Sequence, residues 1–195
     1  MIMYLQANQI LDKGGNKMND LLKIDDTFNE SMFISKVNNI MVMLHTSIML
    51  NDLDRVRHFI SDDLEKKFED KLNMLNKKNE TQMYDEFNVK SSNINDIIIK
   101  DNIVEIDVNV ILRYMDYIVN KETGDFIRGN NKSRVEKSYL LKFVRIISKK
   151  YNGRTFECTN CGATLNINNT GVCPYCRKVF KAEDYDYILT DIIER

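Results

Sequence analysis

The chain has 195 residues, of which 43% are hydrophobic and 29% are charged, and its formal net charge is -1. This length supports one domain with a hydrophobic core and one small additional module, and the balanced charge argues against a protein that binds polyanions over its whole surface. Because no uninterrupted apolar run reaches the roughly eighteen residues that a membrane span needs, we expect a soluble or at most peripheral protein.

The first segment, residues 1–22, begins with the apolar cluster Met1–Leu5 and continues into the polar stretch Asp12–Lys17. We predict a short helix or a loose tail here. An apolar chain start of this kind docks on its own domain, on a partner or on a membrane surface, and docking on its own domain is the commoner case.

From Asn29 onward, apolar residues recur every three or four positions, which predicts one long helix. Its start is capped either by Thr27, with Glu30 three residues later, or by Asn29. A short second helix is expected over residues 53–60, and Ser61 is suited to cap a third. The apolar face of the long helix consists of Phe33, Val37, Ile40, Leu44 and Ile48. Three methionines thicken this face, and we expect core filling rather than a binding groove from Met41, Met43 and Met49.

After about Gln82 the apolar period becomes two, which predicts long strands with one buried face. The clearest alternation runs from Val104 to Leu112, and a turn containing Gly124 separates this strand from the next, which reaches about Ile147. Helices followed by hairpin-connected strands predict an α+β fold, with a long bent antiparallel sheet wrapped around the first long helix.

Near the C-terminus the chain carries all four of its cysteines, in two C-x-x-C pairs separated by eleven residues: Cys158, Cys161, Cys173 and Cys176. Each pair reverses the chain so that two thiolates face one point, and two such turns supply the tetrahedral sulfur set that zinc prefers. Gly162 and Pro174 suit these turns, and the alternating stretch 163–172 suits a hairpin between the pairs. We therefore predict a zinc ribbon that holds one structural zinc ion.

Other uses of the cysteines fit less well. A disulfide pair needs an oxidising compartment, and the chain start has no secretory signal pattern. A redox C-x-x-C is expected singly and near a βαβ pattern, which the sequence lacks. Four protein ligands leave no open position for water or substrate, so the predicted zinc folds the chain rather than catalysing a reaction.

Four short segments, in this order, resemble the translocase-of-inner-membrane-44-like (Tim-44-like) domain. They are residues 24–29 entering a helix with Phe33, residues 51–57 before 59–62, the strand and turn 117–124 with 128–129, and the closing segment 184–189 with Tyr187. The closing segment and the ribbon together resemble bacterial members in which this domain is fused to a C-terminal zinc ribbon. The resemblance covers about residues 22–195.

This resemblance implies a cone similar to nuclear-transport-factor-2-like proteins, with N-terminal helices packed on a bent antiparallel sheet and followed by the ribbon. We accordingly predict three parts: a tail or short helix over 1–22, a Tim-44-like α+β domain over 23–150, and the zinc ribbon with the C-terminal segment over 151–195.

The family also implies a non-catalytic scaffold that binds other proteins and anionic lipid at a membrane and takes part in protein transport. Several bacterial relatives carry an N-terminal anchor that this chain lacks, so we expect a cytoplasmic protein, with peripheral attachment at the inner face of the membrane as the alternative. A protein is the expected partner.

A small-molecule-binding or enzymatic domain of the cone class is one alternative, but the candidate catalytic groups are poor. His45 lies on the long helix, where packing in the core is commoner than catalysis, and His58 is expected at a surface. Glu105 and Asp107 lie on the polar face of their strand, which a solvated sheet explains. We found no nucleophile elbow, phosphate loop or second metal cluster, and predict that the protein is not an enzyme.

A nucleic-acid-binding ribbon is the other alternative, because basic and aromatic side chains alternate in this region as a phosphate backbone and stacked bases require. The basic residues are Lys142, Arg145, Lys149, Lys150, Arg154, Arg177, Lys178 and Lys181, and the aromatic ones are Tyr151, Phe156, Tyr175 and Phe180. Lipid and protein contacts suit the same residues, and we favour these over nucleic acid.

Overall fold

The structure is a computed structural model, and it describes residues 17–147, 155–158, 160–166, 173–177 and 186–195. Within this part, residues 17–24 form a helix, which agrees with the short helix that was one of the two predictions for the N-terminal segment. Residues 1–16 lie outside the described residues, as do most of the predicted 163–172 hairpin loop and the basic stretch 148–154.

The long predicted helix is α2, Glu30–Leu50. The side chain of Asn29 caps it by accepting a hydrogen bond from the Met32 amide at 3.0 Å, so the second of the two predicted caps is the one used. Thr27 instead donates its hydroxyl to Asp25 at 2.7 Å. All five residues predicted for the apolar face are buried.

By length and composition alone, α2 could cross a membrane, although the sequence contains no long unbroken apolar run. In the structure it is a core helix, since eight of its residues are buried in the domain. The helix ends at Asn51, which adopts the left-handed conformation with φ 54°.

Two shorter helices follow, as the sequence predicts. The first is a single 3-10 turn, η1, over Arg57–Phe59, and the second is α3, Asp62–Lys77. Ser61 caps α3 by accepting a hydrogen bond from the amide of Leu64 at 3.3 Å, and acidic residues occupy its positive first turn.

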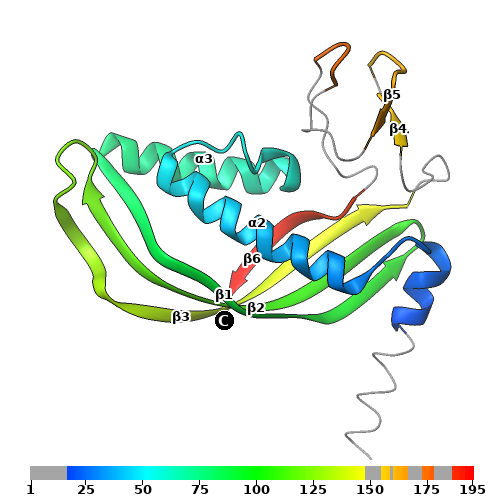
Figure 1. Cartoon of the computed structure of the whole chain (residues 1–195), viewed down its shortest axis with the longest axis horizontal. Helices are drawn as coiled ribbons and strands as arrows, with labels where there is room; N and C mark the ends of the chain where they lie inside the picture. The colour runs from blue at the N-terminus through cyan, green and yellow to red at the C-terminus, as the bar shows by residue number, and fades with distance from the viewer. Residues whose placement is uncertain (1–16, 148–154, 159, 167–172, 178–185) are drawn as a thin grey trace, which may run out of the picture.

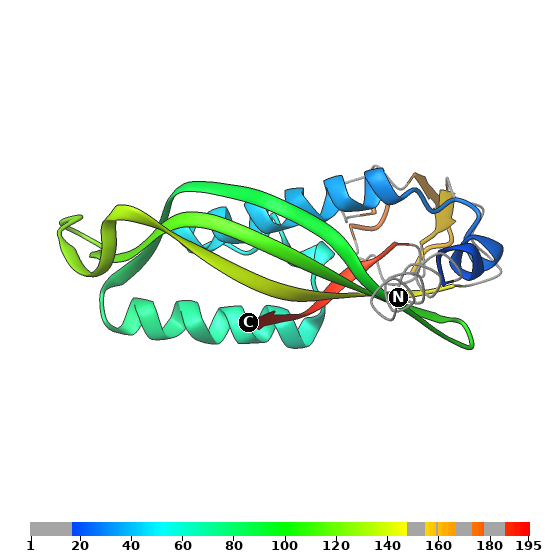
Figure 2. The same cartoon turned by 90° about the horizontal axis from the view of Figure 1, so that it is seen from below.

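Three long strands form the sheet predicted from the alternating pattern. They are β1, Glu80–Lys100, β2, Ile103–Asn120, and β3, Phe126–Ile146, and neighbouring strands are antiparallel. Gly124, with φ 75°, closes the β2–β3 turn as predicted, and the Asn120 side chain accepts hydrogen bonds from the amides of Glu122 and Thr123. The sheet bends around α2, while α3 lies beside α2 on the same concave side (Figures 1 and 2). The fold is thus the predicted α+β cone.

A fourth strand, β6, Ile188–Glu194, comes from the end of the chain and pairs with β3, giving the order β1-β2-β3-β6. The two small strands of the ribbon, β4, Thr155–Glu157, and β5, Thr164–Asn166, form a separate hairpin between β3 and β6 in the sequence. The ribbon is therefore an insertion between two neighbouring strands of the main sheet. The predicted division into 1–22, 23–150 and 151–195 stays a prediction, and the structure adds that the closing segment completes the sheet.

The start of β6 is fixed by a buried polar network. Arg145 of β3 forms an ion pair with Asp25 at 2.5 Å, and the Tyr187 hydroxyl donates to the same carboxylate at 3.1 Å. The Arg145 guanidinium also lies 5.5 Å from the centre of the Tyr187 ring. All three residues are buried, so each charge depends on its partner. The network joins two segments of the family resemblance, 24–29 and 184–189.

Aromatic rings surround this network and attach it to the core. Phe33 of α2 contacts Tyr187 and Phe143 with ring centroids 5.3 and 5.4 Å apart, and Phe28 contacts Tyr187 at 5.7 Å. These edge-to-face contacts add to the area-dependent stabilisation by about 0.5–1.5 kcal/mol per pair.

Replacing Asp25 tests the network. In Asp25→Ala, Arg145 loses its carboxylate in a buried site, so we expect the free energy of unfolding to fall by about 3–5 kcal/mol in urea titrations. Asp26→Ala removes an exposed carboxylate next in the chain and should cost less than about 0.5 kcal/mol. Equal effects of the two variants would contradict the assigned role.

Candidate functional site

The ribbon presents its cysteines on two similar turns. In the first turn the Gly162 amide donates to the Cys158 carbonyl at 2.8 Å, and in the second the Arg177 amide donates to the Cys173 carbonyl, also at 2.8 Å. The residue after each pair has positive φ, 71° at Gly162 and 59° at Arg177. The same local geometry is thus used twice, with glycine at the strained position only in the first turn.

The four predicted ligands come together. Their sulfur atoms lie within 4.8 Å of one another, with Cys158 and Cys176 at 3.6 Å and Cys161 and Cys173 at 3.7 Å. Four thiolates around a zinc-sized ion, with bonds of about 2.3 Å, are separated by about 3.8 Å. A disulfide bond is about 2.05 Å long, far shorter than either of these two sulfur–sulfur distances. The cluster can therefore bind a metal ion, while the identity of that ion as zinc stays a prediction.

The protein environment favours a bound cation. Backbone amides of Asn160 and Cys161 donate to the Cys158 sulfur and lower the pKa of that thiol. The Ala163 amide acts in the same direction on Cys161, but desolvation and the three neighbouring thiols outweigh it and raise the pKa of Cys161 to about 12. Four thiolates at this distance repel one another, and a divalent cation removes that repulsion.

His45, a candidate of the enzyme hypothesis, is a packed core residue. Its Nδ1 lies 2.8 Å from the Met41 carbonyl, and its ring contacts Tyr84 at 4.7 Å and Phe87 at 4.2 Å between centroids. Burial lowers the pKa of His45 to about 4, so the ring is neutral at physiological pH. This agrees with the expected packing role.

The other candidates of the enzyme hypothesis also have structural surroundings. The His58 ring is half-buried and contacts the Phe59 ring at a tilt of 45°, with the ring centroids 4.1 Å apart. Glu105 and Asp107 share Lys142, whose Nζ lies 2.6 and 3.2 Å from their oxygens. The hydrogen bond to Glu105, followed by that to Asp107, raises the pKa of Lys142. Asp107 is buried rather than solvated, which corrects the expectation for its face of the sheet.

Two cations of the predicted basic patch are not available to a phosphate backbone. Arg145 is buried against Asp25, and Lys142 is bound by the two carboxylates just described. Arg177 and Tyr175 are exposed, Phe156 lies in β4, and the remaining residues of the patch lie outside the described part of the chain. Lys142 and Arg145 therefore do not contribute to the basic surface that the nucleic-acid alternative requires.

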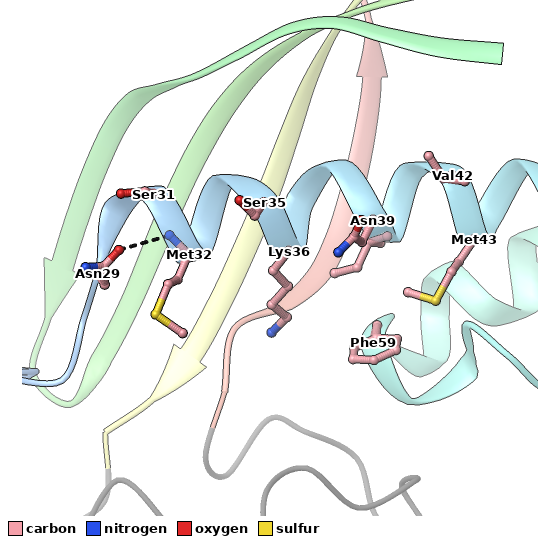
Figure 3. A pocket seen from close by; sticks show the side chains of 10 residues that line it. Asn29, Ser31, Met32, Ser35, Lys36, Asn39, Val42, Met43 and Phe59 are labelled. Carbon is pink, nitrogen blue, oxygen red and sulfur yellow. Dashed lines mark hydrogen bonds between the residues drawn. The ribbon is translucent and has the colours of Figure 1, made fainter.

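Among the described residues, a groove lies along the outer side of α2, which the sequence did not predict. Its volume is about 660 Å³, and it runs from Asn29 to Met43 with Phe59 of η1 at one side. Figure 3 shows Met32, Lys36 and Met43 pointing toward the same side of α2. The further lining residues are Ser31, Ser35, Asn39, Ile40 and Val42. Of the methionines assigned to the core, Met41 is buried as expected, whereas Met43 packs partly on the core and also lines this groove.

The one charged side chain among these lining residues is compensated. Lys36 forms an ion pair with Asp186 at 2.6 Å and donates to the carbonyl of Tyr187 at 2.6 Å. Burial lowers the pKa of Lys36, and Asp186 opposes that shift. The groove therefore offers apolar side chains with a neutral polar rim, and one of them, Met32, is 73% exposed.

Comparison with protein families identifies the domain. The family model described as Tim44-like domain matches residues 15–154, so the chain belongs to the Tim44-like family. Proteins of this family are membrane-associated and act with protein partners in transport. Comparison with curated protein sequences gave no match.

Stripping the metal tests how far the ribbon and the domain are coupled. The bound metal links the two cysteine turns and so shortens the flexible part of the connection between β3 and β6. Without the metal this flexible part becomes longer by less than twofold, which raises the free energy of loop closure by at most about 0.6 kcal/mol. We expect chelation to abolish amide protection over 155–177 while the urea midpoint of the helices barely changes. Simultaneous loss of all helical signal would show that the two parts unfold as one.

The two cysteine turns allow a matched test. A Cβ added at Gly162 meets no atom within 4 Å, so Gly162→Ala adds only the cost of positive φ, about 1–2 kcal/mol, and should weaken metal affinity about fivefold or more. Arg177→Gly removes the same cost and should strengthen affinity to a similar extent, as measured by competition with a chelating dye. Arg177→Ala is the control, because it removes the charge but keeps a side chain at a residue with positive φ. If Arg177→Ala strengthened metal affinity as much as Arg177→Gly, the effect would come from the lost charge and not from the backbone conformation.

His45 should make the stability depend on pH. Its folded pKa of about 4 lies below the unfolded value near 6.5, so its contribution is complete above pH 6.5 and is lost as the pH falls through 4. The full loss is about 3 kcal/mol. The free energy of unfolding of His45→Leu, measured by urea titration between pH 7 and 4.5, should lack this part of the pH dependence. If the free energies of the variant and the parent fell in parallel with pH, this prediction would be contradicted.

Proposed function

We propose that this protein is a non-catalytic scaffold of protein transport, which binds a partner protein along α2 and carries one structural zinc ion in its ribbon. Its place is the cytoplasm, at the inner face of the membrane, where it attaches peripherally. The apolar groove outside α2 is the observation that carries this proposal, since exposed apolar surface with a polar rim is typical of protein recognition sites.

The shape and chemistry of the groove suit an amphipathic helix of the partner. Asn29 to Met43 is about 21 Å of helix, long enough to align with three to four turns of a second helix. Met32 and Met43 are flexible and polarisable, so they adapt to different apolar side chains. With Lys36 compensated by Asp186, the groove favours an uncharged apolar face over an acidic or basic one.

A scaffold role is also supported by the surroundings of the titratable residues. His45 contacts aromatic side chains, and the Tyr114 hydroxyl is hydrogen-bonded to that of Tyr139 at 2.8 Å. Catalysis needs such a group within reach of a substrate. The four sulfurs of the ribbon can supply all four ligands of a tetrahedral site, which suits a structural metal.

Photo-crosslinking from the groove tests the scaffold. Benzoylphenylalanine in place of Val42, on the groove, should give one discrete protein adduct in the native cell, and mass spectrometry should identify a transport component. The same probe in place of Asn131, exposed on β3, is the control. Met32→Glu should reduce the adduct at least fivefold by adding charge to the groove. Equal adducts from both positions would refute this docking surface.

A further inference from the structure

The chain on the C-terminal side of the ribbon helps to build the groove. One wall of the groove belongs to α2, which contributes Lys36, and another part belongs to η1, which contributes Phe59. The start of β6 contacts both elements. Asp186 forms an ion pair with Lys36 at 2.6 Å, and the Leu189 carbonyl accepts a hydrogen bond at 2.9 Å from the amide of Ser61, just after η1. A segment distant in the sequence therefore connects the two sides of the groove.

Lys36 places a charge within the apolar lining of the groove. In Figure 3 its side chain lies between those of Met32 and Phe59. Its amine lies 5.9 Å from the centre of the Phe59 ring and also donates a hydrogen bond to the Tyr187 carbonyl at 2.6 Å. The side chains of Lys36 and Asp186 are 20% and 32% exposed, so salt and water screen this ion pair less than a pair on the open surface. A helix bound in the groove therefore meets Lys36 together with its counter-ion.

The charge that a bound helix meets depends on Asp186. With Asp186 in place, the pair has no net charge, so a carboxylate or an ammonium group on the helix loses water without gaining a partner of opposite charge. Without Asp186, the Lys36 ammonium would be uncompensated and would attract a carboxylate. Interfaces select their partners as much by such unfavourable charges as by favourable contacts. A residue outside the lining of the groove can thus decide which helices bind there.

We propose that Asp186 sets the charge selectivity of the α2 groove, so that the groove accepts a partner helix with an uncharged side chain opposite Lys36 and rejects one with a carboxylate there. This inference rests on the proposed function of the groove. It adds a chemical requirement on the partner, and it gives the segment after the ribbon a part in recognition.

Three synthetic helical peptides test this selectivity on the full-length protein. A helix of about fourteen residues matches the groove of about 21 Å. Each peptide consists of leucine, alanine and glutamine, and the three differ only at the middle of the leucine face, which carries glutamine, glutamate or lysine. By fluorescence anisotropy, the parent protein should bind the glutamine peptide about tenfold more tightly than either charged peptide. In Asp186→Asn, which keeps the size of the side chain, the affinity ratio of the glutamate to the glutamine peptide should rise at least tenfold.

Matched variants separate charge selectivity from a loss of structure. Lys36→Met leaves Asp186 as the uncompensated charge and should make the lysine peptide the tightest ligand. Lys36→Met combined with Asp186→Asn removes both charges and should restore the preference for glutamine. Glu30→Gln removes an exposed carboxylate of α2 that does not line the groove, and should leave the ratios unchanged. Because all three peptides meet the same protein sample, their affinity ratio does not depend on the folded fraction of a variant.

The possible outcomes distinguish this inference from the proposed function. Benzoylphenylalanine in place of Val42 should crosslink the glutamine peptide to the parent protein, which locates the binding in the groove. Absence of this adduct for every peptide, in the parent and in all variants, would refute the groove as a helix-binding site and the inference with it. Adducts accompanied by the same glutamate-to-glutamine ratio in the parent and in Asp186→Asn would refute the selectivity alone and leave the proposed function in place.

Discussion

The structure depends on one buried ion pair, between Asp25 and Arg145, that is completed by the hydroxyl of Tyr187. These residues come from the turn before α2, from β3 and from the segment after the ribbon, so the pair holds together three distant parts of the chain. A buried charge without its partner is strongly unfavourable, whereas the pair itself adds little net stability. We therefore infer that the pair acts on specificity, by fixing the position in which β6 enters the sheet.

This arrangement also separates the strands of the cone from the cysteine ribbon along the chain. The ribbon departs from β3 and returns to β6, and these two strands are held by their own hydrogen bonds and by the buried pair. Among the described residues, the sulfur cluster joins the two cysteine turns to each other. We therefore expect the folding of the ribbon to be separable from that of the cone.

Helix α2 combines two tasks on its two sides. Its inner side fills the concave face of the sheet, and its outer side forms the floor of the groove. A helix that is apolar on both sides is normally buried all round. On the outer side of α2, the charge of Lys36 is paired with that of Asp186, so the groove carries no net charge from these two residues and keeps its apolar lining.

Local patterns in the sequence determined the helices, the alternating strands and the four cysteines, because caps, apolar periods and C-x-x-C turns involve residues near one another in the chain. Only the tertiary structure decided what covers each face. Asp25 and Tyr187 are in contact although they lie 162 positions apart in the sequence. Arg145 and Lys142, which were expected in a basic patch, form ion pairs with carboxylates instead. Met43, which was expected in the core, also lines a groove. Periodicity predicts which side chains share a face of a helix or strand. Whether those side chains are buried or paired with a charge depends on which distant segment packs against that face, and a local sequence pattern does not contain this information.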